Sequence, residues 1–284
     1  MTPIVRINRL NENENVDVYA KLEGWNPGGS VKDRPVLKMI EEAEKEDLLF
    51  GKTIIEASSG NTGIALAMIG AVKGYDVEIV MPENASEERK KIIAAYGAKI
   101  TQTPGSEGVD GAIRLANKKL TEMPEKYFMP DQYSNGHNPS SHYAQTAEEI
   151  LKQVGNVDVF VAGIGTGGTI MGVGKFLKEK NNQTRIVAAE PNPNHRICGL
   201  KNMETSIVPK IFHRTRVDET LYVNDEEAVQ TTRDLAKKEG ILAGISSGAA
   251  MWAALTIARK MKKGKIVVLL PDRGERYLST GLFG

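Results

Sequence analysis

Lys32 follows a Gly-Gly turn in the stretch NPGGSVKDRP, which covers residues 26–35. Ser30 and Asp33 have the spacing of a capping box, so we expect a helix to begin near Val31. Lys32 would then project from the first turn of that helix, where the partial positive charge of the helix end lowers the pKa of an ammonium group. Lys32 is therefore either a solvated surface cation or a lysine kept partly neutral as a nucleophile or base.

Three loops rich in glycine, serine and threonine could bind an anion. We expect each to follow a strand and to open a helix, in the stretches IIEASSGNTGIALAMIG from Ile54, VFVAGIGTGGTIMGVG from Val159 and ILAGISSGAAMWAAL from Ile241. The first N–H groups of a helix have no partner within it, so they bind phosphate or carboxylate groups. Three such loops together predict a crevice that surrounds a small anionic molecule.

The second loop also fits a dinucleotide-binding fingerprint. Its glycines, from Gly163, have the spacing G-x-G-x-x-G after a strand, and Glu190 ends the next strand. On spacing alone a nicotinamide cofactor is a serious candidate. The hydroxyls of Thr166 and Thr169 suit a terminal phosphate better than a bridging pyrophosphate, and no lysine follows the glycines as a Walker A motif requires. A phosphate-bearing aldehyde held by Lys32 would be pyridoxal phosphate.

The elements that must position these residues alternate between strands and helices. Strands are expected at 53–57, 76–80, 98–101, 158–162, 185–190, 219–223 and 265–270. Helical patterns lie between them, at 86–97, 108–120, 141–155 and 224–240. This alternation is typical of α/β proteins with parallel sheets covered by helices on both faces. The strands form two groups, and the polar, turn-rich stretch 131–141 separates them.

Composition limits the other classes of function. The chain has 284 residues, of which 40% are hydrophobic and 26% charged, and its net charge is +1. Nucleic acid and anionic membranes are therefore poor candidates for the main partner. A single cysteine, Cys198, fits a reducing compartment, and the first residues lack the apolar core of a signal peptide, so we expect a cytoplasmic protein. The longest uncharged run, 241–258, is interpreted as a turn and a buried helix, and no metal site is expected.

The motifs keep their order and spacing over nearly the whole chain, and together they resemble a known family. The matching stretches are KLEGWNPGGSVKDR, IEASSGNTGIALAMIGAVKGY, MPENASEERKKIIAAYGA, DQYSN, GIGTGGTIMGV, GISSGAA and DRGERYLSTGLF. They resemble the cysteine synthases (O-acetylserine sulfhydrylases) of the fold type II, or tryptophan synthase β-like, enzymes that depend on pyridoxal phosphate. The ending DRGERYLSTGLF is most similar to the B-type enzyme, the isozyme that can also use thiosulfate.

The resemblance implies an α/β architecture with two domains, each a twisted and mostly parallel sheet flanked by helices, with pyridoxal 5'-phosphate in the cleft between them. A smaller, mobile domain would cover residues 39–140 and bind the substrate carboxylate. A larger domain would combine residues 1–38 and 141–284 and bind the cofactor phosphate. Closure of the smaller domain would exclude water from the cleft. The family also implies a homodimer.

The implied reaction replaces the β-substituent of an O-activated serine, with O-acetylserine as the first choice, by sulfur from sulfide or thiosulfate to give L-cysteine. Lys32 would hold the cofactor as a Schiff base and later take the substrate's α-proton. Ser246 would hydrogen-bond the pyridine nitrogen without holding it protonated, and Asn61 would lie beside the ring oxygen. The cofactor phosphate would be bound by Gly165, Thr166, Gly167, Gly168 and Thr169. The substrate carboxylate would be bound by Ser58, Ser59, Gly60, Asn61, Thr62 and Gln132.

Several alternatives stay open. Within enzymes they are an O-phosphoserine sulfhydrylase, a cystathionine β-synthase-type enzyme and a serine/threonine dehydratase. A different class would be a homologue that acts mainly by docking the tail of a serine acetyltransferase. Arg196 and Lys201, in the stretch NHRICGLKN, could bind a second anion such as thiosulfate, although solvated cations are the favoured interpretation.

Overall fold

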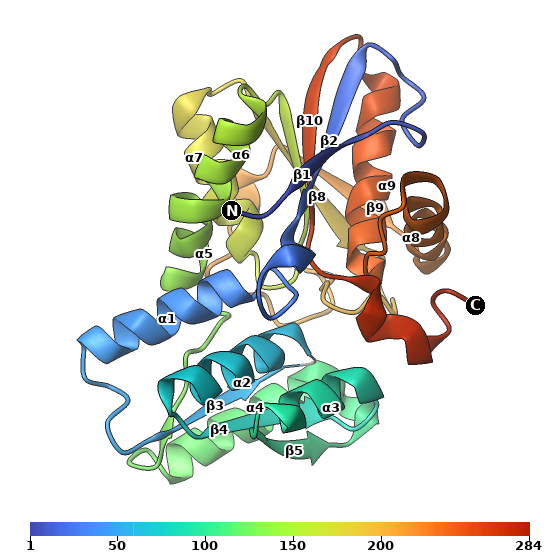
Figure 1. Cartoon of the computed structure of the whole chain (residues 1–284). Helices are drawn as coiled ribbons and strands as arrows, with labels where there is room; N and C mark the ends of the chain where they lie inside the picture. The colour runs from blue at the N-terminus through green and yellow to red at the C-terminus, as the bar shows by residue number, and fades with distance from the viewer. Residues whose placement is uncertain (59) are drawn as a thin grey trace.

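The computed structural model describes residues 1–58 and 60–284, and two β-sheets organise it (Figure 1). The larger sheet has the strand order β1-β2-β10-β7-β8-β9, and its neighbours are parallel except for the pair β1 and β2. Its strands are β1 (Ile4–Ile7), β2 (Val16–Leu22), β7 (Val159–Gly163), β8 (Arg185–Pro191), β9 (Glu219–Val223) and β10 (Gly264–Leu270).

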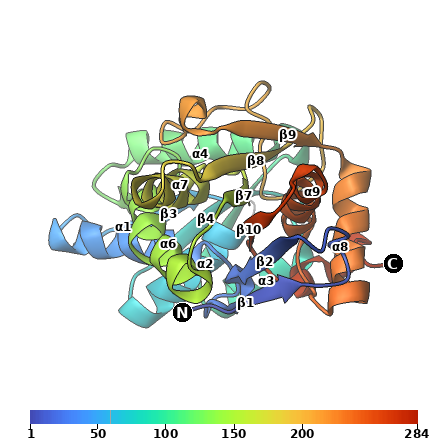
Figure 2. The ribbon, with the colours of Figure 1, turned by 90° about the horizontal axis from the view of Figure 1, so that it is seen from above.

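Helices cover both faces of the larger sheet (Figure 2). Successive residues of a strand point to opposite faces, so Phe160 packs in a cluster with α6 and α7, whereas Val161 packs in a cluster with α8 and α9. A π-helical turn (His142–Thr146) connects α5 to α6. The helices are α5 (His137–Ser141), α6 (Ala147–Val154), α7 (Gly168–Lys180), α8 (Asp225–Glu239) and α9 (Ile245–Lys260). Burial on both faces explains why the central strands β7 and β10 are almost continuously apolar.

The smaller sheet has the order β5-β4-β3-β6, and all its neighbours are parallel. Ile54 shares a cluster with α1, α2 and α3, and Ile55 shares one with α4 on the opposite face. The strands are β3 (Thr53–Ala57), β4 (Val77–Pro82), β5 (Lys99–Thr103) and β6 (Tyr127–Phe128). The helices are α1 (Asp33–Lys45), α2 (Asn61–Lys73), α3 (Glu87–Ala95) and α4 (Gly108–Glu122). Short 3₁₀ helices lie at Glu23–Trp25, Gly105–Glu107, Arg214–Arg216 and Gly274–Thr280.

The predicted α/β class, with two mostly parallel sheets flanked by helices, is confirmed. All the strands expected from the sequence are present, within a few residues of the expected bounds. β1, β2 and β6 were missed. β1 and β6 have only four and two residues, and charged residues interrupt the apolar pattern of β2. The domain boundaries at 38 and 140 stay predictions; α1, which packs against both α2 and α5, runs across the first of them.

Two local predictions were wrong. Ser30 and Asp33 form no capping box: α1 begins at Asp33, whose carboxylate accepts a hydrogen bond from the N–H of Gly28, and Lys32 is the N-cap residue. The third loop does not follow a strand either. It connects α8 to α9. Among the described residues, its β-pairing is limited to one isolated bridge between Ala243 and Arg273. No helix in the described part of the chain is long and apolar enough to cross a membrane.

Candidate active site

One cavity gathers most of the residues that were predicted to hold a cofactor. Lys32 reaches it from the start of α1, Asn61 from the start of α2, and Ser246 from the first turn of α9. The loop between β7 and α7 forms another wall. The lining residues are Val31, Lys32, Asn61, Gly163, Gly165, Thr166, Gly167, Thr169, Gly199, Leu200, Ser246, Leu269 and Pro271. The cavity lies at the carboxyl ends of β7 and β10, where open α/β sheets bind their ligands.

The backbone around Lys32 is fixed while its amine is left available. The N–H of Val31 donates to Pro271 O at 2.8 Å, and the N–H of Lys32 donates to Ser30 Oγ at 3.2 Å. Among the described residues, no hydrogen bond or ion pair engages Lys32 Nζ. Burial lowers the pKa of Lys32, and the nearby Asp272 carboxylate opposes this shift only in part. An amine in such a place is suited to act as a nucleophile and base.

The glycine loop leaves no room for side chains. A Cβ at Gly165 would lie 2.3 Å from the carbonyl oxygen of Gly199, and one at Gly168 would lie 1.8 Å from Asn138 Oδ1. Gly167, the N-cap of α7, has a φ of +86°, which favours glycine. The loop therefore brings bare backbone and the first N–H groups of α7 to the cavity. This arrangement fits the terminal phosphate of pyridoxal phosphate.

Two buried side chains lie behind the threonines of this loop. His142 Nε2 is 3.4 Å from Thr169 Oγ1, and its Nδ1 is 3.0 Å from Thr146 Oγ1. Burial, with the charges of Lys32 and Arg34, lowers the pKa of His142 well below its usual value, so the imidazole is neutral. Asn138 makes the corresponding contact with Thr166. From the sequence, His142 is expected only to cap or pack the following helix and Asn138 is not singled out, although both belong to the stretch NGHNPSSH between the two strand groups.

The C-terminal segment holds Asn61. Asn61 Nδ2 donates to Asp272 Oδ2 at 2.7 Å, and Arg276 donates to Asn61 Oδ1. The hydroxyl of Tyr277 donates to the same Asp272 oxygen at 2.7 Å. Ser246 is buried, and its hydroxyl bonds to none of the side chains that the structure describes. Asp272, Arg276 and Tyr277 all belong to the motif DRGERYLSTGLF, which is the sequence signal for this support.

The residues predicted to bind the substrate carboxylate are bonded to one another. Ser58 Oγ accepts from the N–H groups of Gly60 and Gly63 at 3.1 and 3.0 Å. Thr62 Oγ1 donates to Gln132 Oε1 at 2.7 Å. All of these side chains are buried. Ser59 was predicted to belong to this set and lies outside the described residues.

Glu56 was missed by sequence reasoning and lies beneath this loop. It is 2% exposed, and its carboxylate oxygens accept from the N–H of Ala57 at 3.1 Å and the N–H of Gln132 at 3.2 Å. Gln132 Nε2 in turn donates to Ala57 O at 3.0 Å. Burial raises the pKa of Glu56 to about 8, although the backbone hydrogen bonds oppose the shift. Glu56 therefore fixes the position of Gln132 relative to β3.

The dinucleotide alternative fails at its acidic residue. Glu190 is fully buried, and its carboxylate accepts from the N–H of Met203 at 2.7 Å and from Arg214 at 2.8 Å. Both oxygens are therefore engaged within the protein, and neither is presented to a ribose. The residues of the cavity fit a phosphate-bearing aldehyde instead, since the side chain of Lys32 and a glycine loop face the same space.

The expectation for Lys201 was wrong. Its side chain is not solvated: the residue is 9% exposed, Nζ lies 3.2 Å from Asp110 Oδ1 of α4, and it lies over the ring of Tyr133. Arg196 is exposed, as the favoured interpretation expected. With its charge balanced by Asp110, Lys201 is a weaker candidate for binding a second anion.

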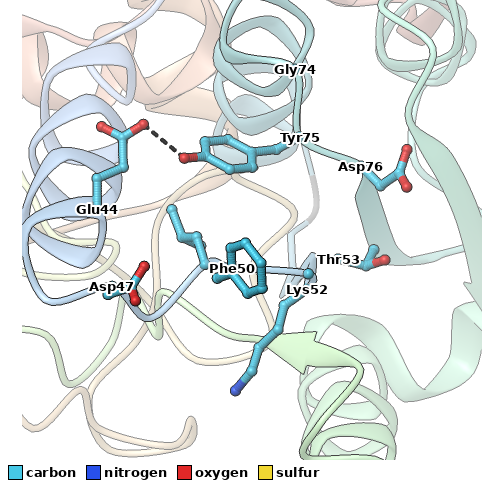
Figure 3. Close-up of a pocket in the computed structure, with 10 residues that line it drawn as sticks. Glu44, Asp47, Phe50, Lys52, Thr53, Gly74, Tyr75 and Asp76 are labelled. Carbon is cyan, nitrogen blue, oxygen red and sulfur yellow. Dashed lines mark hydrogen bonds between the residues drawn. The ribbon is translucent and has the colours of Figure 1, made fainter.

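A separate hollow opens at the other end of the smaller sheet (Figure 3). It lies at the amino ends of β3 and β4, between Thr53, Asp76 and the exposed ring of Phe50. Glu44 accepts a hydrogen bond from the hydroxyl of Tyr75 at its rim. None of the predicted site residues lies there, and ligands of open parallel sheets bind at the carboxyl ends. The cavity at Lys32 is therefore the candidate active site.

Comparisons with known proteins agree with this chemistry. Residues 1–272 match the family described as "Pyridoxal-phosphate dependent enzyme". The chain is 51% identical to a cysteine synthase of Aquifex aeolicus, covering 99% of this chain and 89% of the relative. It is 44% identical to cysteine synthase B of Pseudomonas aeruginosa, covering 99% and 94%.

Among solved structures, the cysteine synthase of Entamoeba histolytica superposes with a TM-score of 0.93 at 39% identity, covering 99% of this chain and 88% of that one. A match over most of the chain, together with a lysine and a glycine loop facing one cavity, identifies the cofactor class. The chain belongs to the family of pyridoxal-phosphate dependent enzymes.

Proposed function

We propose that this protein is a cysteine synthase that replaces the β-substituent of an O-activated serine by sulfur. The observation that carries the proposal is the cavity in which the amine of Lys32, without a hydrogen-bond partner in the described part of the chain, faces the glycine loop and Ser246. The close relatives named cysteine synthase support the same reaction. O-acetylserine is the preferred substrate in this proposal, and L-cysteine is the product.

Lys32 has two tasks in the proposed reaction. It attaches the cofactor, and its amine then takes the proton from the α-carbon of the substrate, a task that a lowered pKa favours. Bound pyridoxal phosphate supplies an electron sink for the α-carbon. Ser246 would donate a hydrogen bond to the pyridine nitrogen without carrying a charge, so that nitrogen would not be held protonated. This favours prompt loss of the β-substituent. Asn61, which Asp272 and Arg276 hold in place, would lie beside the ring oxygen of the cofactor.

The carboxylate-binding role is proposed for the loop at the start of α2. The residues assigned to it are Ser58, Ser59, Gly60, Asn61, Thr62 and Gln132. Because the described side chains of this loop already bond to one another, the substrate carboxylate must exchange with these bonds when it binds. We propose that residues 39–140 move as a unit toward the larger sheet in this step and exclude water from the cavity.

The sulfur donor and the isozyme type are finer proposals. The C-terminal motif DRGERYLSTGLF and the likeness to a cysteine synthase B favour the B-type enzyme, which would accept thiosulfate as well as sulfide. A homodimer in the cytoplasm is proposed with it. Docking of a serine acetyltransferase tail would use the carboxylate loop, so an added tail peptide would then inhibit competitively against O-acetylserine.

Product analysis tests the function. The protein loaded with pyridoxal phosphate is supplied with sulfide and either O-acetylserine, O-phosphoserine or serine, and in a separate assay with serine and homocysteine. L-cysteine, cystathionine and pyruvate are measured. The proposal expects the highest kcat/KM with O-acetylserine. A preference for O-phosphoserine would assign the sulfhydrylase alternative, and faster reaction of serine with homocysteine would assign a cystathionine β-synthase. Release of pyruvate without sulfur transfer would assign a dehydratase and overturn the proposal.

A further inference from the structure

Asn138 connects the loops to which phosphate and carboxylate are assigned above. It lies in α5 and is 1% exposed. Its Nδ2 atom donates to the main-chain oxygen of Gln132 at 2.8 Å and to Thr166 Oγ1 at 3.1 Å. A primary amide has two protons to donate. One therefore serves each loop.

The hydrogen bond from Asn138 to Thr166 determines whether the Thr166 hydroxyl accepts from a further partner or donates to it. Thr166 Oγ1 accepts from Asn138 Nδ2 and also from the N–H of Gly168 at 3.3 Å. A hydroxyl has two acceptor positions and one proton. Since both acceptor positions are taken, the proton is left for a third partner, and Thr166 lines the cavity. Thr166 is thus set as a donor, which is the role that a phosphate oxygen requires.

The bond to Gln132 completes the support of its main chain. The N–H of Gln132 donates to Glu56, and its carbonyl oxygen accepts from Asn138, so the peptide groups on both sides of the residue are held. The side chain then reaches Thr62 and Ala57 from a fixed position. Loss of the Asn138 bond would release the carboxylate loop on the side that faces the phosphate loop.

Packing alone does not explain an amide at this place. Asn138 Oδ1 is buried, and among the described residues it has no hydrogen-bond partner. It lies 1.8 Å from the position of a Cβ at residue 168, which is glycine. A buried acceptor without a partner is destabilising. What this amide contributes is therefore the pair of hydrogen bonds that its Nδ2 atom donates.

We infer that Asn138 is a positioning residue that sets both subsites: it turns Thr166 into a phosphate donor and holds Gln132 for the substrate carboxylate. This inference rests on the proposed function for the identity of the carboxylate ligand. It assigns to one buried side chain a joint control over cofactor affinity and substrate affinity.

The first test measures binding to the full chain freed of cofactor, with inorganic phosphate and pyridoxal phosphate as probes. Asn138→Ala should weaken both by roughly 10-fold, since one donor alignment is lost. Asn138→Asp keeps the volume, yet it should bind both more weakly than Asn138→Ala. Its carboxylate accepts the proton of Thr166 and repels phosphate. A packing role predicts the opposite order.

Ser141→Ala is the matched control. Ser141 lies on the same helix, is buried, and donates through Oγ to the carbonyl oxygen of Asn138 at 2.7 Å, so its loss removes a buried bond without touching either loop. We expect the phosphate affinity of this variant to equal that of the wild type. Equal affinities in all variants, or equal losses in Ser141→Ala and Asn138→Asp, would overturn the inference.

The second test is the KM for O-acetylserine at saturating cofactor. Asn138→Ala should raise KM by about 10-fold and change kcat less, because the bond that holds Gln132 is lost. An unchanged KM with weakened phosphate binding would overturn the joint control. If Asn138→Ala does not fold, Asn138→Asp decides both tests. Failure of the proposed function gives a different result: the wild type forms no L-cysteine, while phosphate binding still weakens in the Asn138 variants as predicted.

Discussion

In the cofactor cavity, the amine of Lys32 and the hydroxyl of Ser246 have no hydrogen-bond partner among the described residues, whereas Thr62 and Gln132 in the adjacent loop bond to each other. The two regions share the start of α2, where Asn61 lines the cavity and Thr62 belongs to the loop. One region thus presents unused groups on a rigid backbone. The other presents groups that already satisfy one another.

The difference matches the ligands that the two regions are proposed to bind. A cofactor that stays bound can be held by polar groups that have no partner in the empty protein. The protein is without their bonds only until the cofactor binds. A substrate that enters and leaves in every cycle needs a loop that is stable both with and without it. Internal bonds such as Thr62 to Gln132 provide the second state.

The largest expected effect comes from removing the unused amine. Lys32→Ala should lower the rate of L-cysteine formation by at least about 10³-fold, because both cofactor attachment and proton transfer are lost. The variant should still fold, and its midpoint of urea unfolding should not fall, because burial of the Lys32 amine opposes folding. Activity within tenfold of the wild type would contradict the assignment of Lys32.

A methyl group in the glycine loop tests the rigid backbone. Gly165→Ala places a Cβ 2.3 Å from Gly199 O, so we expect the dissociation constant of pyridoxal phosphate to rise by more than about 10-fold. Gly136→Ala is the control, because a Cβ there has open space and the backbone has an ordinary negative φ. Equal cofactor affinity in the two variants would show that the loop does not form the phosphate site.

The bonded region should respond differently. Gln132→Ala removes the partner of Thr62, so we expect KM for O-acetylserine to rise by about 10-fold while the affinity for pyridoxal phosphate stays unchanged. Gln102→Ala, an exposed position on β5 of the same sheet, serves as the control. If cofactor affinity fell and KM did not change, the roles of the two regions would be reversed.

The last prediction concerns stability and not activity: Glu56, whose pKa is raised to about 8, should make the stability of the protein depend on pH. Between about pH 4.5 and pH 8 the folded protein keeps a proton on Glu56 that the unfolded chain has lost, so this residue makes stability fall as pH rises. The full difference is at most about 5 kcal/mol. As pH rises from about 4.5 to 8, the free energy of unfolding of the wild type should fall relative to that of Glu56→Gln, which has no group to titrate at this position.

Urea unfolding at several pH values measures the effect of Glu56. Glu125→Gln, an exposed position in the same half of the chain, should run parallel to the wild type. A constant difference between Glu56→Gln and the wild type from pH 5 to pH 8 would show that Glu56 is ionised throughout, and that the loop rests on a charged group.

The fold and the cavity could be predicted because local patterns specify them. The apolar runs of β7 and β10 identify buried parallel strands, and the glycines at 165–168 identify a close approach of backbone. The residues that support the site could not be predicted from the sequence. Asn138, Glu56 and Asp272 act through partners that are distant in the sequence, and a buried amide or carboxylate has no spacing rule. The capping box predicted at Asp33 fails for a local reason, since its carboxylate accepts from the N–H of Gly28 and not from that of Ser30.

The central claim is that the cavity at Lys32 carries pyridoxal phosphate and performs sulfur transfer to an O-activated serine. The most direct measurement is the visible absorption spectrum of the purified, loaded protein, before and after O-acetylserine and then sulfide. We expect a cofactor band that shifts with O-acetylserine, returns with sulfide as L-cysteine appears, and is absent in Lys32→Ala. A wild type that shows no band when pyridoxal phosphate is supplied, or a band equally present in Lys32→Ala, would contradict it.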